Sequence, residues 1–209
     1  MAFVKKYAFQ IAVAVLCLIM AGYLLSTYVL KKEEPYPIIK EAPQFSLTSI
    51  NGEEVSLENT KGKIRIVYFY FASCPDVCPP TTYKLGEFQD MLRKDGRLGT
   101  EVELISISFD PETDTDDVIR TFAERTGAEL EGWHFVRGDS RDQMIELARE
   151  FDVAVIYDDV EKTFYHTNPI IIVDENNFIR TQVNGSPNEA AGDEPFTADV
   201  LYEAIKRVK

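Results

Sequence analysis

The hydrophobic pattern divides the chain into an apolar N-terminal segment and a longer region of short alternating elements. Residues 7–30 contain no charged side chain and are flanked by two lysines on each side. A helix of that length, rising about 1.5 Å per residue, can cross a hydrocarbon core about 30 Å thick. The run is longer than the apolar core of a cleaved signal peptide. We therefore expect a short tail, residues 1–6, followed by an uncleaved membrane anchor, residues 7–30.

A proline-containing segment separates the predicted anchor from the rest of the chain. Residues 31–43 carry three prolines and charges of both signs, which favours a semi-extended tether. We expect one folded domain over residues 44–209, which is long enough for a sizeable core. A single N-terminal span favours export, so we place this domain on the extracytoplasmic side of a bacterial cytoplasmic membrane. Cys17 follows the bulky Leu16 and is interpreted as an ordinary apolar residue of the anchor.

Strand and helix patterns alternate from residue 44 onward. Asn51-Gly52 predicts a hairpin turn, and the nearly continuous apolar runs 63–71 and 102–109 predict strands buried on both faces. Shorter strands are expected near residues 133–138, 153–157, 169–173 and 178–182. Helices are predicted from apolar faces at Leu85, Phe88, Met91 and Leu92; Val118, Ile119, Phe122 and Ala123; Met144, Ile145, Leu147, Ala148 and Phe151; and Phe196, Val200, Leu201, Ala204, Ile205 and Val208. This order predicts an α/β fold with a mixed sheet, arranged as in thioredoxin.

Two caps refine the expected helix boundaries. We expect one helix to begin near Asp114 or Thr115 and to stop at Gly127. Ser140 and Gln143 have the spacing of a capping box ahead of the next helix.

The charge of the domain excludes one class of partner. The first 32 residues hold four lysines and no acidic residue, so the rest of the chain carries 18 basic against 35 acidic side chains. Such a surface repels phosphate backbones, which excludes nucleic-acid binding.

Two cysteines, Cys74 and Cys78, lie where the first long strand meets its helix, in the stretch FASCPDVCPPTT. A disulfide closing so small a loop stabilises a fold by only about 2 kcal/mol, which makes a purely structural bridge a weak explanation. The N-terminus of a helix favours thiolate, the form that attacks disulfides and binds metals. The following prolines predict that the helix begins at Pro80, with Cys78 just outside it.

The three-residue spacing distinguishes this pair from thioredoxin redox motifs, which have two residues between the cysteines. The wider loop leaves room for both sulfurs to face one ion, and soft thiolates with an imidazole suit Cu(I) or Cu(II). The domain has two histidines. His134, beside the only tryptophan, is interpreted as a structural strand residue. His166 precedes the apolar run 170–173, in a loop expected to approach the cysteines near Pro169, and is the predicted third ligand.

Together these motifs resemble the Sco (SenC) family of thioredoxin-fold proteins. The resemblance is carried by CPDVCP at residues 74–79, SISFDPETDT at 106–115, and YHT followed by IIIVD at 170–174. It implies that Cys74, Cys78 and His166 bind copper. It also implies a role in assembling the binuclear copper centre of cytochrome c oxidase, whose copper-bearing subunit is the expected partner. Asp76 and Asp110 match family positions near the site.

Other chemistry remains open at this stage. The pair could act as a thiol-disulfide oxidoreductase that reduces the oxidase cysteines, with Cys74 attacking and Cys78 resolving. A thiol reductant and a copper donor are then further expected partners. A peroxiredoxin is disfavoured because Pro75 stands where a threonine is needed, three positions before Cys78. A structural zinc site is disfavoured because it needs four ligands and three candidates are present.

Overall fold

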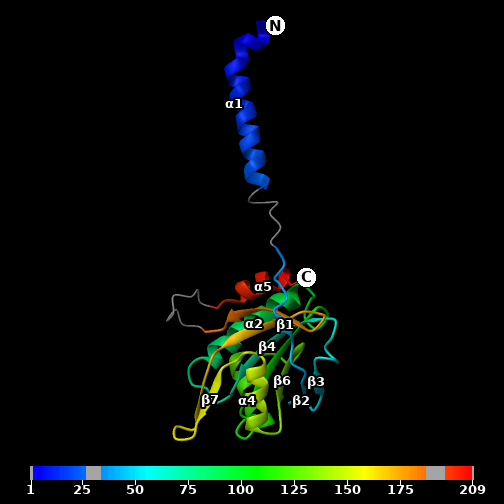
Figure 1. Cartoon of the computed structure of the whole chain (residues 1–209), viewed down its shortest axis with the longest axis vertical. Coiled ribbons are helices and arrows are strands. Elements are labelled where there is room, and N and C mark those ends of the chain that lie inside the picture. Colours follow the sequence, from blue (N-terminus) through cyan, green and yellow to red (C-terminus); the bar gives the residue numbers. More distant parts are fainter. Residues whose placement is uncertain (1, 27–33, 187–195, 209) are drawn as a thin grey trace. The chain divides into compact units, whose positions relative to one another are not determined.

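The computed structural model describes residues 2–26, 34–186 and 196–208 and divides into two compact units, Met1–Glu34 and Pro35–Lys209. The described part of the first unit contains helix α1 (Ala2–Leu24), at the N-terminal end of the ribbon in Figure 1. Its segment Tyr7–Leu24 has a mean hydropathy of 2.0 and is long and apolar enough to cross a membrane. The last four residues of the predicted anchor, 27–30, lie outside the described residues.

An eight-stranded mixed sheet forms the centre of the second unit. From one edge to the other its strands are β1 (Lys40–Glu41), β10 (Phe178–Asn184), β9 (Pro169–Val173), β4 (Ile64–Tyr70), β5 (Val102–Ser108), β6 (Trp133–Arg137), β2 (Ser46–Ser49) and β3 (Glu54–Ser56). β4, β5 and β6 run parallel, and the other neighbours pair antiparallel. Every residue of β4 and β5 is buried, as their continuous apolar runs predict.

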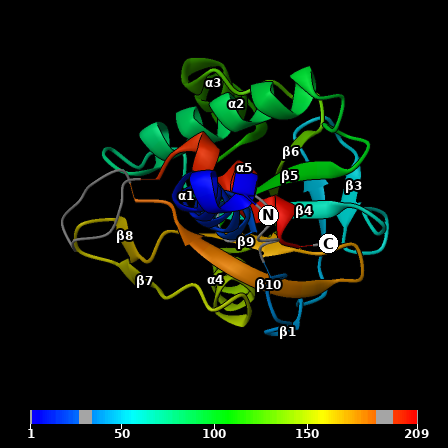
Figure 2. The ribbon, with the colours of Figure 1, turned by 90° about the horizontal axis from the view of Figure 1, so that it is seen from above.

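Helices cover both faces of this sheet. Figure 2 shows α2 (Cys78–Lys94), α3 (Asp116–Thr126) and α5 (Ala198–Lys206) on one face and α4 (Arg141–Glu150) on the other. The parallel neighbours β4 and β5 are connected through α2, and β5 and β6 through α3. The predicted thioredoxin-like α/β fold is confirmed, and it places the cysteine loop at the end of a central strand.

The predicted helix boundaries rest on caps that the structure contains. The Thr115 side chain accepts a hydrogen bond from the N–H of Val118, and Ser140 does the same for Gln143. Gly127 ends α3 with φ of 73°, in the left-handed region that glycine adopts without strain. Thr115, rather than Asp114, is the N-cap of α3, which leaves the Asp114 carboxyl available for another contact.

A two-stranded hairpin lies apart from the main sheet (Figure 2). It pairs β7 (Val155–Asp158) with β8 (Thr163–His166) in antiparallel register. We predicted a strand near the position of β7 but not β8, because four residues with half-exposed ends carry little periodicity. Tertiary packing stabilises β8: its one buried side chain, Phe164, packs against Phe109 with ring centroids 4.7 Å apart.

The compact unit begins earlier than the predicted domain. Residues 35–43, expected as a tether, contain β1, which pairs with β10. The N–H of Tyr36 donates to the carbonyl of Arg207, and Ala42 is buried. The segment is extended, as its prolines indicate, but backbone pairing holds its C-terminal part on the sheet edge.

Candidate metal and redox site

The cysteine loop begins where β4 ends and leads directly into α2. The helix starts at Cys78, two residues before the predicted start at Pro80, and its N-cap is Val77. Pro79 and Pro80 therefore lie in the first turn of α2. Backbone N–H groups in a first turn have no acceptor within the helix, so the missing N–H of a proline breaks no helical hydrogen bond there. The expectation that Cys78 lies outside the helix was wrong for this reason. Its sulfur sits at the N-terminal end of α2.

Both cysteines are free thiols held close to each other. The amide N–H of Cys78 points to Cys74 Sγ at 3.4 Å. Cys74 is 8% exposed, whereas Cys78 is fully buried. The two sulfurs thus differ in access: one reaches the edge of a cavity, and the other lies behind it.

The pKa values of the two cysteines are shifted in opposite directions. A hydrogen bond from the Cys78 thiol, aided by the His166 ring and by the amides of Cys78 and Asp76, lowers the pKa of Cys74 to about 3. The same bond to Cys74, together with burial and the charge of Cys74, raises the pKa of Cys78 well above its ordinary value. These opposite shifts favour a thiolate at Cys74 and a thiol at Cys78.

His166 is the last residue of β8, and it lines the same cavity as Cys74 of the cysteine loop. Its ring packs edge-on against Phe109 and Phe71, with centroids 5.0 and 5.9 Å away. Nδ1 lies 2.8 Å from the carbonyl oxygen of Thr167 and donates to it. Nε2 is then the nitrogen left for Cys74 or for a metal ion, the second-shell arrangement that metal-binding histidines commonly have.

A cavity of about 310 Å³ brings two of the predicted site residues to one surface. Cys74, Asp76, Phe164, His166 and Ser186 are among its lining residues. Cys78 is not in the wall, and among the described residues no three His, Cys, Asp or Glu side chains are placed to hold a metal ion together. The structure thus joins Cys74 to each of the other two predicted ligands, but it does not assemble all three.

Hydrogen bonds fix the segment after His166 against the start of α2. The side-chain amide of Asn168 donates to Thr81 Oγ1 at 3.2 Å, and this hydroxyl donates to the carbonyl of Gly185 at 2.7 Å. The N–H of Gly185 in turn donates to the carbonyl of Asn168 at 2.8 Å. No peptide bond among the described residues is cis, so Pro169 is trans. Asn168 therefore sets the distance between the histidine segment and the cysteine helix.

The remaining charged candidates have separate positions. Asp110 is buried and accepts two hydrogen bonds from the guanidinium of Arg141, at 2.8 and 3.2 Å, which assigns it to a structural ion pair. Asp76 lies in the cysteine loop and lines the cavity. His134 lies on β6 with Nε2 3.5 Å from Glu103, and it does not line the cavity.

Sequence reasoning missed a group of buried polar residues behind the cysteines. Asp114, considered only as a helix cap, accepts hydrogen bonds from the N–H of Ala72 at 2.9 Å and the hydroxyl of Ser108 at 2.6 Å. Tyr68 and Tyr70 were assigned only to an apolar strand, yet burial raises the pKa values of both phenols, and the charge of Cys78 raises them further. The two tyrosines in a strand predicted to be buried were the sequence feature that could have indicated this polar group.

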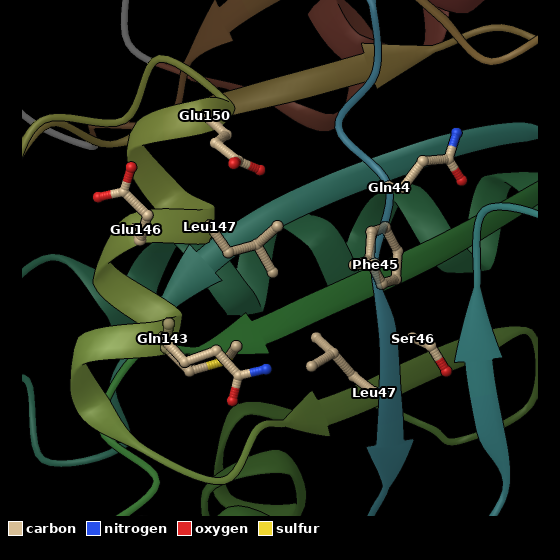
Figure 3. Close-up of a pocket in the computed structure, with 9 residues that line it drawn as sticks. Gln44, Phe45, Ser46, Leu47, Gln143, Glu146, Leu147 and Glu150 are labelled. Atoms are coloured by element: carbon tan, nitrogen blue, oxygen red, sulfur yellow. The ribbon is translucent and has the colours of Figure 1, made fainter.

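A separate groove of about 400 Å³ lies between α4 and β2 (Figure 3). Phe45, Leu47 and Leu147 form its apolar part, and Glu146 and Glu150 stand on the helix beside it. No cysteine or histidine lines this groove. The thiol chemistry of the folded unit is thus centred on the cavity at the cysteine loop.

The folded unit thus combines a thioredoxin-like fold with two cysteines at the start of α2 and a histidine at the end of β8. The SCO1/SenC family model matches residues 35–194, which is most of the folded unit. The chain therefore belongs to the SCO1/SenC family.

Individual relatives agree with this assignment. The SCO1 protein homolog of Bacillus subtilis (strain 168) is 28% identical over 153 residues, covering 73% of this chain and 78% of the relative. The structure of BsSco, a member of the Sco family of cytochrome c oxidase assembly proteins with a disulfide switch, has a TM-score of 0.69 at 24% identity, covering 85% of this chain and 99% of that one. Copper-bound ScoI of Bradyrhizobium japonicum has a TM-score of 0.59 at 27% identity, covering 73% of this chain and 96% of that one.

Proposed function

We propose that this protein is a membrane-anchored copper-binding protein that assists assembly of the binuclear copper centre of cytochrome c oxidase. One observation carries the proposal. Cys74 and His166, from segments far apart in the sequence, line the same cavity, and the His166 ring contributes to the lowered pKa of Cys74. Cys78 lies directly behind, with its amide N–H 3.4 Å from Cys74 Sγ.

The donor set fits copper. Two sulfurs and one imidazole nitrogen suit Cu(I), and a thiolate pair with an imidazole also binds Cu(II). The lowered pKa of Cys74 favours the thiolate, the form that binds metal. In the proposed complex the Cys78 sulfur turns toward the cavity and loses its proton as the metal–sulfur bond forms, because thiolate is the ligand. A solved relative in the same family, ScoI of Bradyrhizobium japonicum, has copper bound.

The rest of the chain and the family support the proposed membrane setting and partner. The apolar segment Tyr7–Leu24 supports a single-pass anchor in the bacterial cytoplasmic membrane with the folded unit on the extracytoplasmic side. BsSco is a cytochrome c oxidase assembly protein, which supports the copper-bearing oxidase subunit as the recipient. A separate copper donor completes the proposed route.

Copper titration of the full chain in detergent tests the ligand set. A Cys17→Ser background leaves Cys74 and Cys78 as the only thiols of the three cysteines. We expect one Cu(I) or Cu(II) per chain, and a thiolate-to-copper absorption band for Cu(II). His166→Ala removes a ligand and should lower the affinity by about 100-fold or more.

The other histidine provides the matched control. His134 lies on β6 away from the cavity, so His134→Ala should leave affinity and spectrum unchanged. Equal copper affinity in His166→Ala and the parent would remove His166 from the site. Absence of stoichiometric binding in the reduced parent would remove the copper function itself.

A second function is favoured by the unequal acidities of the two thiols. A thiolate at Cys74 and a buried thiol at Cys78 match the nucleophilic and resolving roles of a disulfide reductase. In that case the protein reduces the cysteines of the oxidase copper site, and a thiol reductant regenerates the pair. The reduction potential of the couple and turnover of a disulfide-bonded oxidase fragment test this role. Rapid turnover without copper supports it, and no turnover with the reduced chain contradicts it.

A further inference from the structure

Strand β8 has one edge that no other strand of the described residues covers. It pairs with β7 alone, and the two form the hairpin that lies apart from the main sheet (Figure 2). The edge of a strand presents a row of backbone N–H and carbonyl groups that can pair with another extended chain. The outer edge of β8 therefore has pairing capacity that the hairpin itself does not use.

The register of the hairpin shows which backbone groups lie at this edge. The N–H of Thr167 donates to the carbonyl of Ala154, next to the opposed residues Val155 and His166. Hydrogen-bonded and non-hydrogen-bonded pairs alternate along an antiparallel ladder. His166 and Phe164 therefore belong to non-hydrogen-bonded pairs, so their N–H and carbonyl groups point away from β7.

This edge forms part of the wall of the cavity at the cysteine loop. Every residue of β8, Thr163–His166, lines the cavity, whereas the β7 side of the hairpin does not. Successive side chains of a strand point to opposite faces, so a wall made of consecutive residues is the edge of the strand. Cys74 and Asp76 line the same cavity from the cysteine loop. Its volume of about 310 Å³ is that of a small-ligand site, which suits a short extended segment and excludes a folded element.

The charge around the cavity favours a basic partner. Among the described residues no lysine or arginine lines the cavity, whereas Asp76 does, and it is exposed. The turn of the hairpin adds Asp158, Asp159 and Glu161 against one cation, Lys162. Lys162 pairs with Asp159, which leaves Asp76 and Glu161 without an ion pair in the described part of the chain. A basic side chain on a bound segment would complement these two carboxylates.

The solvent-facing side of the hairpin is apolar. Ile156 and Tyr165 lie directly opposite each other on the two strands and are 67% and 57% exposed. A strand added beside Tyr165 would extend this face, where aromatic and β-branched neighbours stabilise each other. The Tyr165 hydroxyl donates to Glu161 at 2.6 Å, so a basic side chain of the added strand could contact both the ring and the carboxylate.

We propose that the edge of β8 binds, by strand addition, an extended segment of the partner protein that carries a cysteine flanked by apolar and basic residues. The inference rests on the proposed function, because that chemistry brings a partner sulfur or a shared ion to Cys74. Backbone pairing with Phe164 and His166 supplies affinity, and the flanking side chains supply selectivity. The pairing also holds the partner cysteine at the cavity that Cys74 lines.

Disulfide tethering of a short peptide measures this pairing. The full chain in detergent, with Cys17→Ser and Cys78→Ser, retains Cys74 as its one cysteine. The probe is a five-residue peptide with cysteine at its centre, valine on each side and lysine at each end. In a glutathione buffer the peptide thiol attacks the Cys74–glutathione disulfide, forms a new disulfide with Cys74 and releases glutathione as a thiol. Mass spectrometry gives the equilibrium constant of this exchange.

N-methylation of the peptide removes one N–H at a time and retains every side chain. Alternate residues of an added strand direct their N–H groups toward β8. Methylation at one alternating set of positions should therefore lower the exchange constant about tenfold, and methylation at the positions between should leave it within about twofold. In the tethered complex the amide N–H groups of Phe164 and His166 should exchange with solvent about tenfold more slowly than in the glutathione adduct. The N–H of Tyr165, which already faces β7, should be unchanged.

A peptide with glutamate in place of both lysines tests the charge preference. Its exchange constant should be about fivefold lower than that of the lysine peptide. Asp76→Asn and Glu161→Gln should each reduce this ratio. Glu58→Gln, at an exposed carboxylate that does not line the cavity, is the matched control and should retain it. Both peptides react with the same thiol, so any effect of a variant on Cys74 cancels from the ratio.

Two outcomes would overturn the inference. One is an N-methylation series in which the exchange constant shows no alternation, and the other is unchanged amide exchange at Phe164 and His166 in the tethered complex. If Cys78→Ser does not fold, Cys78→Ala provides the same single thiol. Copper binding is measured separately on the reduced parent. Absence of copper binding together with an alternating series would contradict the copper function and leave strand addition standing, and stoichiometric copper with a flat series would do the reverse.

Discussion

At the scale of single residues, the two sulfurs have different chemistry although they are four positions apart. Hydrogen bonds lower the pKa of Cys74 to about 3, so the thiolate persists as pH falls to 5, where an ordinary thiol is almost fully protonated. We expect alkylation of Cys74 by iodoacetamide to change by less than about twofold between pH 5 and pH 8. An ordinary thiol should accelerate on the order of 10³-fold over that interval.

Site-resolved mass spectrometry checks this difference within one molecule. Cys78, buried and protonated, is the internal comparison and should be modified far more slowly throughout. A rate at Cys74 that climbs steeply from pH 5 to pH 8 would show an ordinary thiol and contradict the hydrogen-bond pattern around its sulfur.

At the scale of elements, the site depends on how closely the end of β10 approaches the segment after β8. A Cβ at Gly185 would lie 2.7 Å from the carbonyl oxygen of Asn168, closer than packed atoms allow. Gly185→Ala should therefore displace the segment that carries His166, destabilise the fold by about 1 to 3 kcal/mol, and weaken copper binding. Urea unfolding and copper titration measure the two effects.

Gly52 provides a comparison at another turn. It has φ of 81° in the β2–β3 hairpin, and a Cβ at this position would meet no atom within 4 Å. Gly52→Ala should cost about 1 kcal/mol through backbone strain alone and leave copper affinity intact. If Gly185→Ala binds copper as the parent does, the approach of β10 does not position the histidine.

At the scale of the whole molecule, the division into two units predicts where the chain can be cut. A chain beginning at Pro35 should fold, unfold at the parent temperature within a few degrees, and no longer associate with membranes, because the candidate span lies entirely in the first unit. A chain beginning at Gln44, the boundary expected from sequence, loses β1, the buried Ala42 and the Tyr36 contacts. Thermal unfolding should show it to be clearly less stable; equal stability of the two chains would contradict a role for residues 35–43 in the fold.

Much of the fold could be predicted because its signals are local. The buried strands β4 and β5 are continuous apolar runs, and the caps at Thr115, Ser140 and Gly127 act within one helical turn. The predicted start of α2 at Pro80 lies two residues after the observed start at Cys78, because prolines are compatible with the first turn of a helix. Strand β8 was missed because its stability comes from Phe164 packing against distant rings.

The amino-acid sequence by itself determined the α/β order of elements, the apolar N-terminal segment and the cysteine pair, since each depends on residue type and short spacing. His166 was predicted as the third ligand from the expected approach of its loop, and it stays a prediction. Tertiary structure alone decided which sulfur lines the cavity, which cysteine has the lowered pKa, and that Asp114 contacts the end of β4 through the N–H of Ala72. Burial and electrostatic coupling arise between segments that only folding brings together, here the end of β4, the start of α2 and the loop after β5. A local sequence pattern cannot predict these effects, because the segments involved are far apart in the sequence.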